Sequence, residues 1–338
     1  MIDLSTNYMG LHLKNPIIVG SSGLTDNVKN IVEAEKHGAA AIVLKSLFEE
    51  QIRLEMNRLV KPNDSSFSYT EAIDFISDYA EKNSINNYLK LIKDCKRQTT
   101  IPIIASINCT SNAEWVNFAK KIEEVGADAI ELNIFLLPSD LNHSSEQNEE
   151  VYFEIINEVK KQVKIPIAIK TSYYFSGLAK MMLKLSWTGI SGLVFFNRFF
   201  SPDIDIDNFK ITATNVLSRP EEVSTSLRWV AILSDRLFCD VAASTGIHEG
   251  RDVIKQLLAG AKATQIVSTI YKNGFPHIGK MLTDMETWMQ EKEFKSIEEF
   301  RGTMCYRKTQ NPAAYLRVQF MKYFSDIEED PEANLLKD

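Results

Sequence analysis

The chain has 338 residues, of which 44% are hydrophobic, and a formal net charge of −7 at neutral pH. A chain of this length can bury one large core, and single α/β barrels of this size are common. The negative charge argues against a general nucleic-acid binder, which would carry a basic surface. The four cysteines lie far apart and lack CxxC spacing, which argues against a disulfide framework or a zinc site and favours reduced thiols.

No segment is typical of a membrane anchor or a secretion signal. Uninterrupted apolar runs stay well short of the roughly 18 residues that a membrane helix needs. Residues 1–5 contain neither the basic nor the apolar region of a signal peptide. We therefore expect a cytoplasmic protein with no membrane contact. The five histidines show no metal-ligand spacing, so no metal site is expected either.

Eight short apolar runs recur along the chain. Their continuous hydrophobicity is typical of parallel strands that are buried on both faces. The segments between them carry helical spacing, and glycines such as Gly126 and Gly260 stand where a helix would end before the next strand. The predicted strands cover residues 16–19, 41–44, 102–106, 129–132, 166–169, 192–196, 240–243 and 264–267.

Eight strands that alternate with helices predict either a closed barrel or a doubly wound sheet. The number of strands and the absence of a GxGxxG motif favour a (βα)8 TIM barrel with its active site at the C-terminal rim. Residues 47–100 and 197–239 exceed simple connections, so we predict long insertions after strands 2 and 6. The polar tract 61–66 indicates a cover over the rim. We expect one domain over residues 1–325 and an acidic C-terminal tail over residues 326–338.

Polar residues follow all eight apolar runs. In a (βα)8 barrel these positions converge on the C-terminal rim. One polar strand end is ordinary loop chemistry, whereas eight of them together predict a binding site. The strand ends are Ser21-Ser22, Lys45-Ser46, Asn108, Asn133, Lys170-Thr171, Asn197-Arg198, Ser244-Thr245-Gly246 and Ser268-Thr269.

The last two strand ends are typical of the phosphate site of barrel enzymes, although ordinary helix capping is the alternative for this segment. Lys45 and Lys170 follow buried strands, and each needs an anionic partner because burying an unpaired charge is costly. Each could instead extend to solvent or pair with a neighbouring Glu. Asn108, Asn133 and Asn197 offer donors and acceptors that suit a heterocyclic ring. Together these features favour FMN over a sugar phosphate.

A family resemblance rests on these same residues. Residues 15–23, NPIIVGSSG, resemble the opening segment of dihydroorotate dehydrogenases. Lys45-Ser46 looks like the family's second-strand TKS motif, and residues 131–133 look like its ELN motif. Ile169-Lys170, residues 196–197, the STGI segment 244–247 and the final strand segment 258–269 follow in the family's order. The resemblance covers roughly residues 1–302.

The resemblance implies an FMN-dependent barrel oxidoreductase. Lys170 would lie near the N1/O2 edge of the flavin, where positive charge stabilises the reduced ring. Asn133 and Asn197 are the expected substrate contacts. By this likeness the FMN contacts are Ser21, Ser22, Gly23, Lys45, Ser46, Asn108, Asn133 and Lys170, with a phosphate loop of Thr245, Gly246, Ser268 and Thr269.

The chain departs from the family where the substrate is handled. The family continues its ELN motif with xSCPN or xSSPN, in which the Cys or Ser three residues beyond the Asn is the catalytic base. Leu136 stands at that position here, and a leucine accepts no proton. The family's NxxGxxN substrate loop is also unrecognisable within residues 64–80. Ser139 is the first candidate for a replacement base, and the further candidates are Cys109, His143, Tyr173 and Tyr174.

Three functions follow from these observations. The first is an FMN-dependent oxidoreductase that acts on CH–CH groups of a small substrate, with pyrimidine biosynthesis implied by the resemblance. The second is a flavin-binding protein that has lost catalysis and serves as a partner or scaffold. The third is a flavin-free lyase or aldolase that uses Lys170 in a Schiff base. The expected partner is a small-molecule substrate. A homodimer with a second copy of the chain is an assembly that the sequence leaves open.

Overall fold

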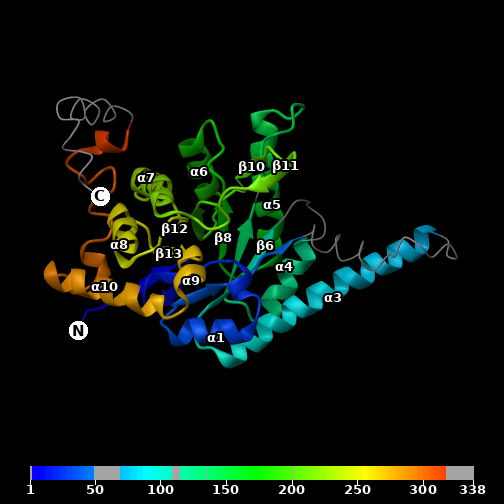
Figure 1. The fold of residues 1–338 in the computed structure, drawn as a ribbon, viewed down its shortest axis with the longest axis horizontal. Helices are drawn as coiled ribbons and strands as arrows, with labels where there is room; N and C mark the ends of the chain where they lie inside the picture. Colours follow the sequence, from blue (N-terminus) through cyan, green and yellow to red (C-terminus); the bar gives the residue numbers. More distant parts are fainter. Residues whose placement is uncertain (1, 49–68, 109–114, 135, 200, 317–338) are drawn as a thin grey trace.

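Eight parallel strands form a closed barrel at the centre of the computed structural model, which describes residues 2–48, 69–108, 115–134, 136–199 and 201–316 (Figure 1). Each barrel strand pairs with the next along the chain, and the last pairs with the first. A two-residue strand, β5 (Leu47–Phe48), pairs beside β6. The barrel strands are β3 (Ile17–Val19), β4 (Ala41–Val43), β6 (Ile103–Asn108), β7 (Ala129–Asn133), β8 (Ile167–Thr171), β9 (Gly192–Phe195), β12 (Asp240–Ser244) and β13 (Ala263–Ile266).

Helices surround the barrel and confirm the predicted (βα)8 TIM fold. Each of the eight predicted apolar runs overlaps one barrel strand. The α-helices are α1 (Val28–Lys36), α3 (Tyr69–Gln98), α4 (Trp115–Glu124), α5 (Ser145–Gln162), α6 (Leu178–Trp187), α7 (Val223–Leu233), α8 (Gly250–Ala259), α9 (Ser268–Asn273) and α10 (His277–Glu291). Short 3₁₀ helices are η1 (Gly23–Thr25), η2 (Pro220–Glu222), η3 (Ile297–Glu299) and η4 (Pro312–Tyr315).

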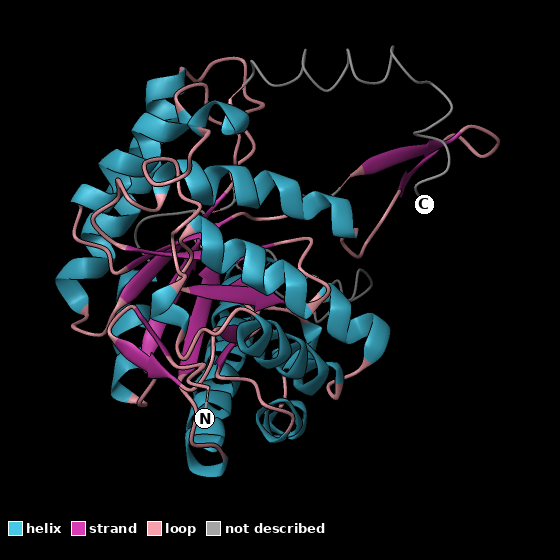
Figure 2. Cartoon of the chain, turned by 90° about the vertical axis from the view of Figure 1, so that its left-hand side faces the viewer, coloured by secondary structure: helices cyan, strands magenta, loops and turns pink. Residues whose placement is uncertain are grey.

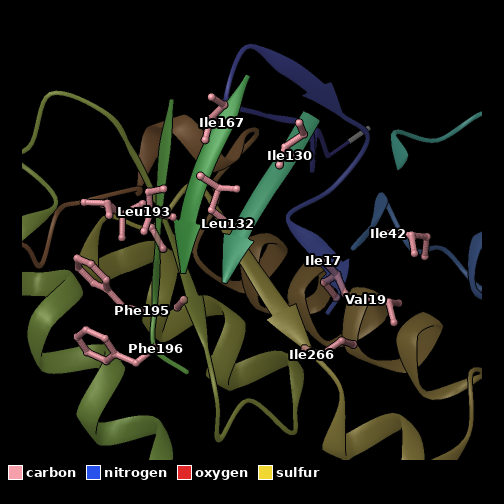
Figure 3. Packing of buried hydrophobic residues seen from close by; sticks show 14 of the residues in the cluster. Ile17, Val19, Ile42, Ile130, Leu132, Ile167, Leu193, Phe195, Phe196 and Ile266 are labelled. Atoms are coloured by element: carbon pink, nitrogen blue, oxygen red, sulfur yellow. The ribbon is translucent and has the colours of Figure 1, made fainter. Parts of the chain in front are cut away.

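The barrel strands divide their side chains between two cores. One set faces the helices, as Ile17, Ile42 and Leu193 do (Figure 3). The residues one position along face the lumen, because successive side chains of a strand point to opposite faces. The inside of an eight-stranded barrel is only wide enough for side chains to fill, so small residues suit it. The lumen set includes Ile18, Ala41, Val43, Ile104, Ala129, Ala168, Val194, Ala242 and Ala263.

An N-terminal hairpin, which the sequence did not predict, closes the bottom of the barrel. It consists of β1 (Thr6–Tyr8) and β2 (Leu11–Leu13), paired antiparallel. Tyr8, Met9 and Leu13 are buried in the lumen core. The Met9 amide donates to Asp240 Oδ2 at 2.8 Å, and a Cβ on Gly192 would lie 2.9 Å from the Met9 side chain. The lumen is therefore filled at its N-terminal end.

The two long connections contain elements that the sequence did not predict. The first contains the helix α3, which runs beside α1 and α4 and extends past the barrel (Figure 1). The second contains an antiparallel hairpin of β10 (Pro202–Asp205) and β11 (Lys210–Ala213), which projects away from the barrel (Figure 2). The predicted cover at 61–66 and the predicted tail at 326–338 lie outside the described residues. Within the described ranges, no helix has the length and apolar character needed to cross a membrane.

Gly260 ends α8 in the left-handed conformation, with φ +113°, as predicted for a helix-ending glycine. A Cβ there would lie 2.2 Å from the Ser234 hydroxyl. Gly126 has φ +94° but nothing within 4 Å of such a Cβ.

We predict that Gly126→Ala lowers the free energy of unfolding by about 1–3 kcal/mol through backbone strain alone. Gly260→Ala should lower it further because of the clash. Urea unfolding of both variants tests this, and equal losses would contradict it.

Candidate active site

A cavity of about 420 Å³ lies at the C-terminal end of the barrel strands. This volume falls within the range of small-molecule sites, which is roughly 300–1,000 Å³. Of the residues predicted to contact the cofactor or the substrate, all line this cavity except Asn108 and Thr269. The lining includes Ser21, Ser22, Gly23, Lys45, Ser46, Asn133, Lys170, Asn197, Thr245, Gly246 and Ser268.

The alternation of the strands places polar residues above the apolar lumen. On β7, Ala129 lies in the lumen core, and Glu131 and Asn133 follow at every second position on the same face. Asn133 stands beside Asn108 of β6 and Lys170 of β8 in the strand register. Three predicted site residues from neighbouring strands therefore share one level of the barrel.

A chain of hydrogen bonds crosses the lumen at this level. Lys170 Nζ donates to Gln265 Oε1 at 2.9 Å, and Gln265 Nε2 donates to Glu131 Oε2. The Lys170 side chain therefore neither extends to solvent nor pairs directly with a carboxylate. Glu131 and Gln265 also line the cavity and were not predicted as site residues. Each is a polar residue within an otherwise apolar strand, and this is the pattern that could have indicated them. Glu131 also lies two positions before Asn133.

Burial perturbs the ionisation of Lys170. It lowers the pKa of the Lys170 ammonium from its ordinary value, because a desolvated cation is less stable, and the nearby Glu131 carboxylate opposes the shift. At the bottom of the lumen, burial raises the pKa of the Tyr8 hydroxyl, and the Glu131 charge adds to this. The field of Glu131 therefore acts on both ends of the lumen.

Three buried oxygen atoms near the cavity lack a hydrogen-bond partner among the described residues. They are Glu131 Oε1, Asn108 Oδ1 and Asn133 Oδ1. Buried polar atoms are nearly always paired, so unpaired ones mark places where another molecule completes the pairing. Glu131 and Asn133 also line the cavity. Their acceptor oxygens suit a ligand that presents N–H or O–H groups.

Hydroxyl groups join the first two strand ends. The Ser46 amide donates to Ser21 Oγ at 2.9 Å, and Ser46 Oγ lies 2.7 Å from Ser106 Oγ. Ser22 Oγ accepts from the Leu24 amide and caps the short helix η1. Ser22 therefore has a local helix-capping role, which the sequence did not predict. Its place in the cavity lining keeps it available as a contact.

The loop after β12 approaches the cavity with its backbone. Thr245 and Gly246 have φ values of +75° and +76°. A Cβ on Gly246 would lie 2.1 Å from the Val223 amide nitrogen, so only glycine fits between this loop and α7. Thr269 Oγ1 donates to the carbonyl of His248 at 2.9 Å and does not line the cavity. The phosphate site predicted for these loops stays a prediction.

The candidate bases lie apart from this cavity. Leu136 lines a second cavity of about 300 Å³ together with Tyr152 and Phe175. Ser139 is exposed and lines neither cavity. His143 and Tyr174 line the second cavity, while Tyr173 packs edge-on against Phe196 of the first. Cys109 lies outside the described residues. None of the candidates placed by the structure lines the first cavity.

Comparison with known proteins identifies the relatives of the chain. The model of the dihydroorotate dehydrogenase family matches residues 3–289. A dihydroorotate dehydrogenase B (NAD(+)) catalytic subunit from Thermoplasma volcanium is 29% identical over 313 residues, covering 91% of this chain and all of the relative. The protein of the same name from Thermoplasma acidophilum is 27% identical over 308 residues, covering 89% of this chain and 99% of the relative. The predicted family resemblance is confirmed.

The lowered pKa of Lys170 predicts a change in stability with pH. In the unfolded chain its pKa takes the ordinary value of 10.5, and in the folded protein the pKa is lower. Between these values only the unfolded state binds the proton, so the free energy of unfolding rises with pH in that window. Lys170→Met should flatten this rise. Urea unfolding of both ligand-free proteins at pH values just below 10.5 measures the difference, and identical slopes would contradict the prediction.

Proposed function

The chain belongs to the dihydroorotate dehydrogenase family, and on this premise we propose that it binds FMN in the cavity at the C-terminal rim. We propose further that it uses FMN to oxidise a CH–CH group of a small substrate. The observation that carries the proposal is the gathering of nearly all the residues predicted to contact FMN around one cavity.

The residues present fit FMN. Lys170 supplies a cation, and Asn133 supplies an unpaired buried acceptor for the N–H edge of a ring. Thr245, Gly246 and Ser268 of the loops after the last two barrel strands lie in the same lining. Such backbone loops after strands seven and eight suit a phosphate group. Bound FMN would accept the two electrons that leave the substrate.

Lys170 has the clearest role in this chemistry. Its ammonium lies in a desolvated position, where a fixed positive charge acts more strongly than it would in water. Held against the flavin ring, this charge would stabilise the negative charge that reduction adds. Asn197 donates from Nδ2 to the Lys170 carbonyl at 3.2 Å and fixes the end of β8 that carries the lysine.

We predict that the purified protein carries FMN rather than FAD. The rim offers loops for one phosphate group, and the sequence lacks the GxGxxG fingerprint that binds a dinucleotide pyrophosphate. Heat denaturation followed by chromatography of the released chromophore distinguishes the two flavins. Recovery of FAD, or of no flavin after incubation with FMN, would sink the proposal.

The residues at the positions where the family handles its substrate favour a substrate other than dihydroorotate. Leu136, at the family's base position, cannot accept a proton and lines the second cavity. A general base typically contributes about 10²–10⁴-fold to such a reaction. We therefore propose an oxidoreductase whose substrate has diverged. Loss of catalysis is the second candidate function, and the same observation at Leu136 favours it.

We predict that dihydroorotate bleaches the flavin of the wild-type protein slowly or not at all under anaerobic conditions. Leu136→Cys alone should recover little, because the family's substrate loop is also unrecognisable. Leu137→Cys, at an exposed neighbour, controls for the mere presence of a thiol. Stopped-flow absorbance measures the bleaching. Rapid bleaching of wild type would contradict the prediction, and Ser139→Ala would then show whether Ser139 has become the base.

The names of the relatives describe a catalytic subunit and NAD(+). We propose that this chain likewise works with a second, different chain that passes electrons on to NAD(+). The projecting hairpin β10–β11 and the C-terminal ends of the barrel strands lie on surfaces that such a chain could approach.

A further inference from the structure

Gln265 stands between two charged groups of the lumen, the half-buried Lys170 and the buried Glu131. Its residue is 2% exposed and Glu131 is 1% exposed. Glu131 comes from β7 and Lys170 from β8, whereas Gln265 comes from β13, which faces β7 across the ring of strands. The hydrogen bonds from Lys170 to Gln265 and from Gln265 to Glu131 therefore span the barrel.

The two charges fix the orientation of the amide. An ammonium group can only donate, and an ionised carboxylate can only accept. Gln265 satisfies both at once, because its carbonyl oxygen accepts from Lys170 and its NH₂ group donates to Glu131. The reverse orientation would place donor against donor and acceptor against acceptor. The amide thus links cation and anion while keeping them apart.

This separation leaves the lysine able to act on a ligand. Only one of the three N–H donors of Lys170 is engaged with Gln265, and Lys170 lines the cavity. A direct ion pair with Glu131 would instead draw the ammonium toward a carboxylate that lies two positions below the level of Lys170 in the strand register. Gln265 instead gives Lys170 a hydrogen-bond acceptor on the far side of the lumen. Through its amide it also links Lys170 to the negative charge of Glu131.

We propose that Gln265 is a positioning residue that holds the Lys170 ammonium against the flavin. The inference rests on the proposed function, because it takes the cavity as the FMN site. Without the Gln265 side chain, Lys170 loses its acceptor and its link to Glu131. The ammonium then turns from the cavity or sheds its proton. Either change removes positive charge from the ring and makes reduction of the flavin less favourable.

The test is the reduction potential of bound flavin in wild type, Gln265→Met, Lys170→Met and the double variant. Methionine keeps an unbranched side chain of similar length but cannot bridge an ammonium and a carboxylate. We expect Gln265→Met to lower the ratio of reduced to oxidised flavin at a fixed potential about tenfold, which is about 30 mV for two electrons. The double variant should match Lys170→Met, because Gln265 acts through Lys170.

A matched control exists in the outer layer. Gln256 on α8 is also fully buried, and its Nε2 donates to Ser226 Oγ at 2.9 Å, away from the cavity lining. Gln256→Met should leave the potential unchanged. If Gln265→Met does not fold, Gln265→Asn keeps an amide too short to bridge both partners and should shift the potential in the same direction.

Three outcomes would count against these ideas in different ways. A flavin-loaded Gln265→Met protein with an unchanged potential would overturn the inference alone. An equal shift with and without Lys170 would also overturn it, because Gln265 would then act on the flavin directly. A wild-type protein that binds no FMN would overturn the proposed function itself.

Discussion

Every feature of the site depends on the closure of the barrel. In a closed sheet, each strand residue points either to the surrounding helices or into the lumen, and the choice alternates strictly along the strand. Ile130 and Leu132 therefore face the helices, which leaves Glu131 and Asn133 no direction except inward (Figure 3). A slip of one residue in β7 would place Leu132 in the lumen and turn the carboxylate toward the outer core.

The side chains in the lumen are apolar at the N-terminal end of the barrel and polar toward the C-terminal end. This order decides at which end a ligand can enter. Small residues and the hairpin side chains of Tyr8 and Met9 fill the lower part. Above them come Lys170, Gln265 and Glu131, whose desolvation costs several kcal/mol per charge unless hydrogen bonds compensate. The amide supplies that compensation for the lysine and for one carboxylate oxygen. Glu131 Oε1 and Asn133 Oδ1 have no partner among the described residues, and both residues line the cavity.

The sequence predicts the parts of this site that follow from local rules. Apolar runs with polar ends locate the strands, so the sequence alone places Lys170 and Asn133 at the rim. Gln265 could not be recognised in this way. It lies inside an apolar run, and its significance comes from contacts with residues 95 and 134 positions away in the chain. The hairpin β10–β11 was missed for a related reason: its strands are mostly exposed, so they lack the continuous apolar pattern of the barrel strands.

The two halves of the site are held by different parts of the fold, which explains how one can change without the other. The residues proposed to hold FMN stand on barrel strands or on loops locked by close contacts, as Gly246 is against α7. Changing them would disturb a packed interior, in which even small volume changes are costly. Leu136 lies in the connection between β7 and α5 and lines a separate cavity. Such a connection can change its chemistry at little cost to the barrel. A change of substrate would therefore fall on the loops, while the hydrogen-bonded chain of Lys170, Gln265 and Glu131 could stay as it is.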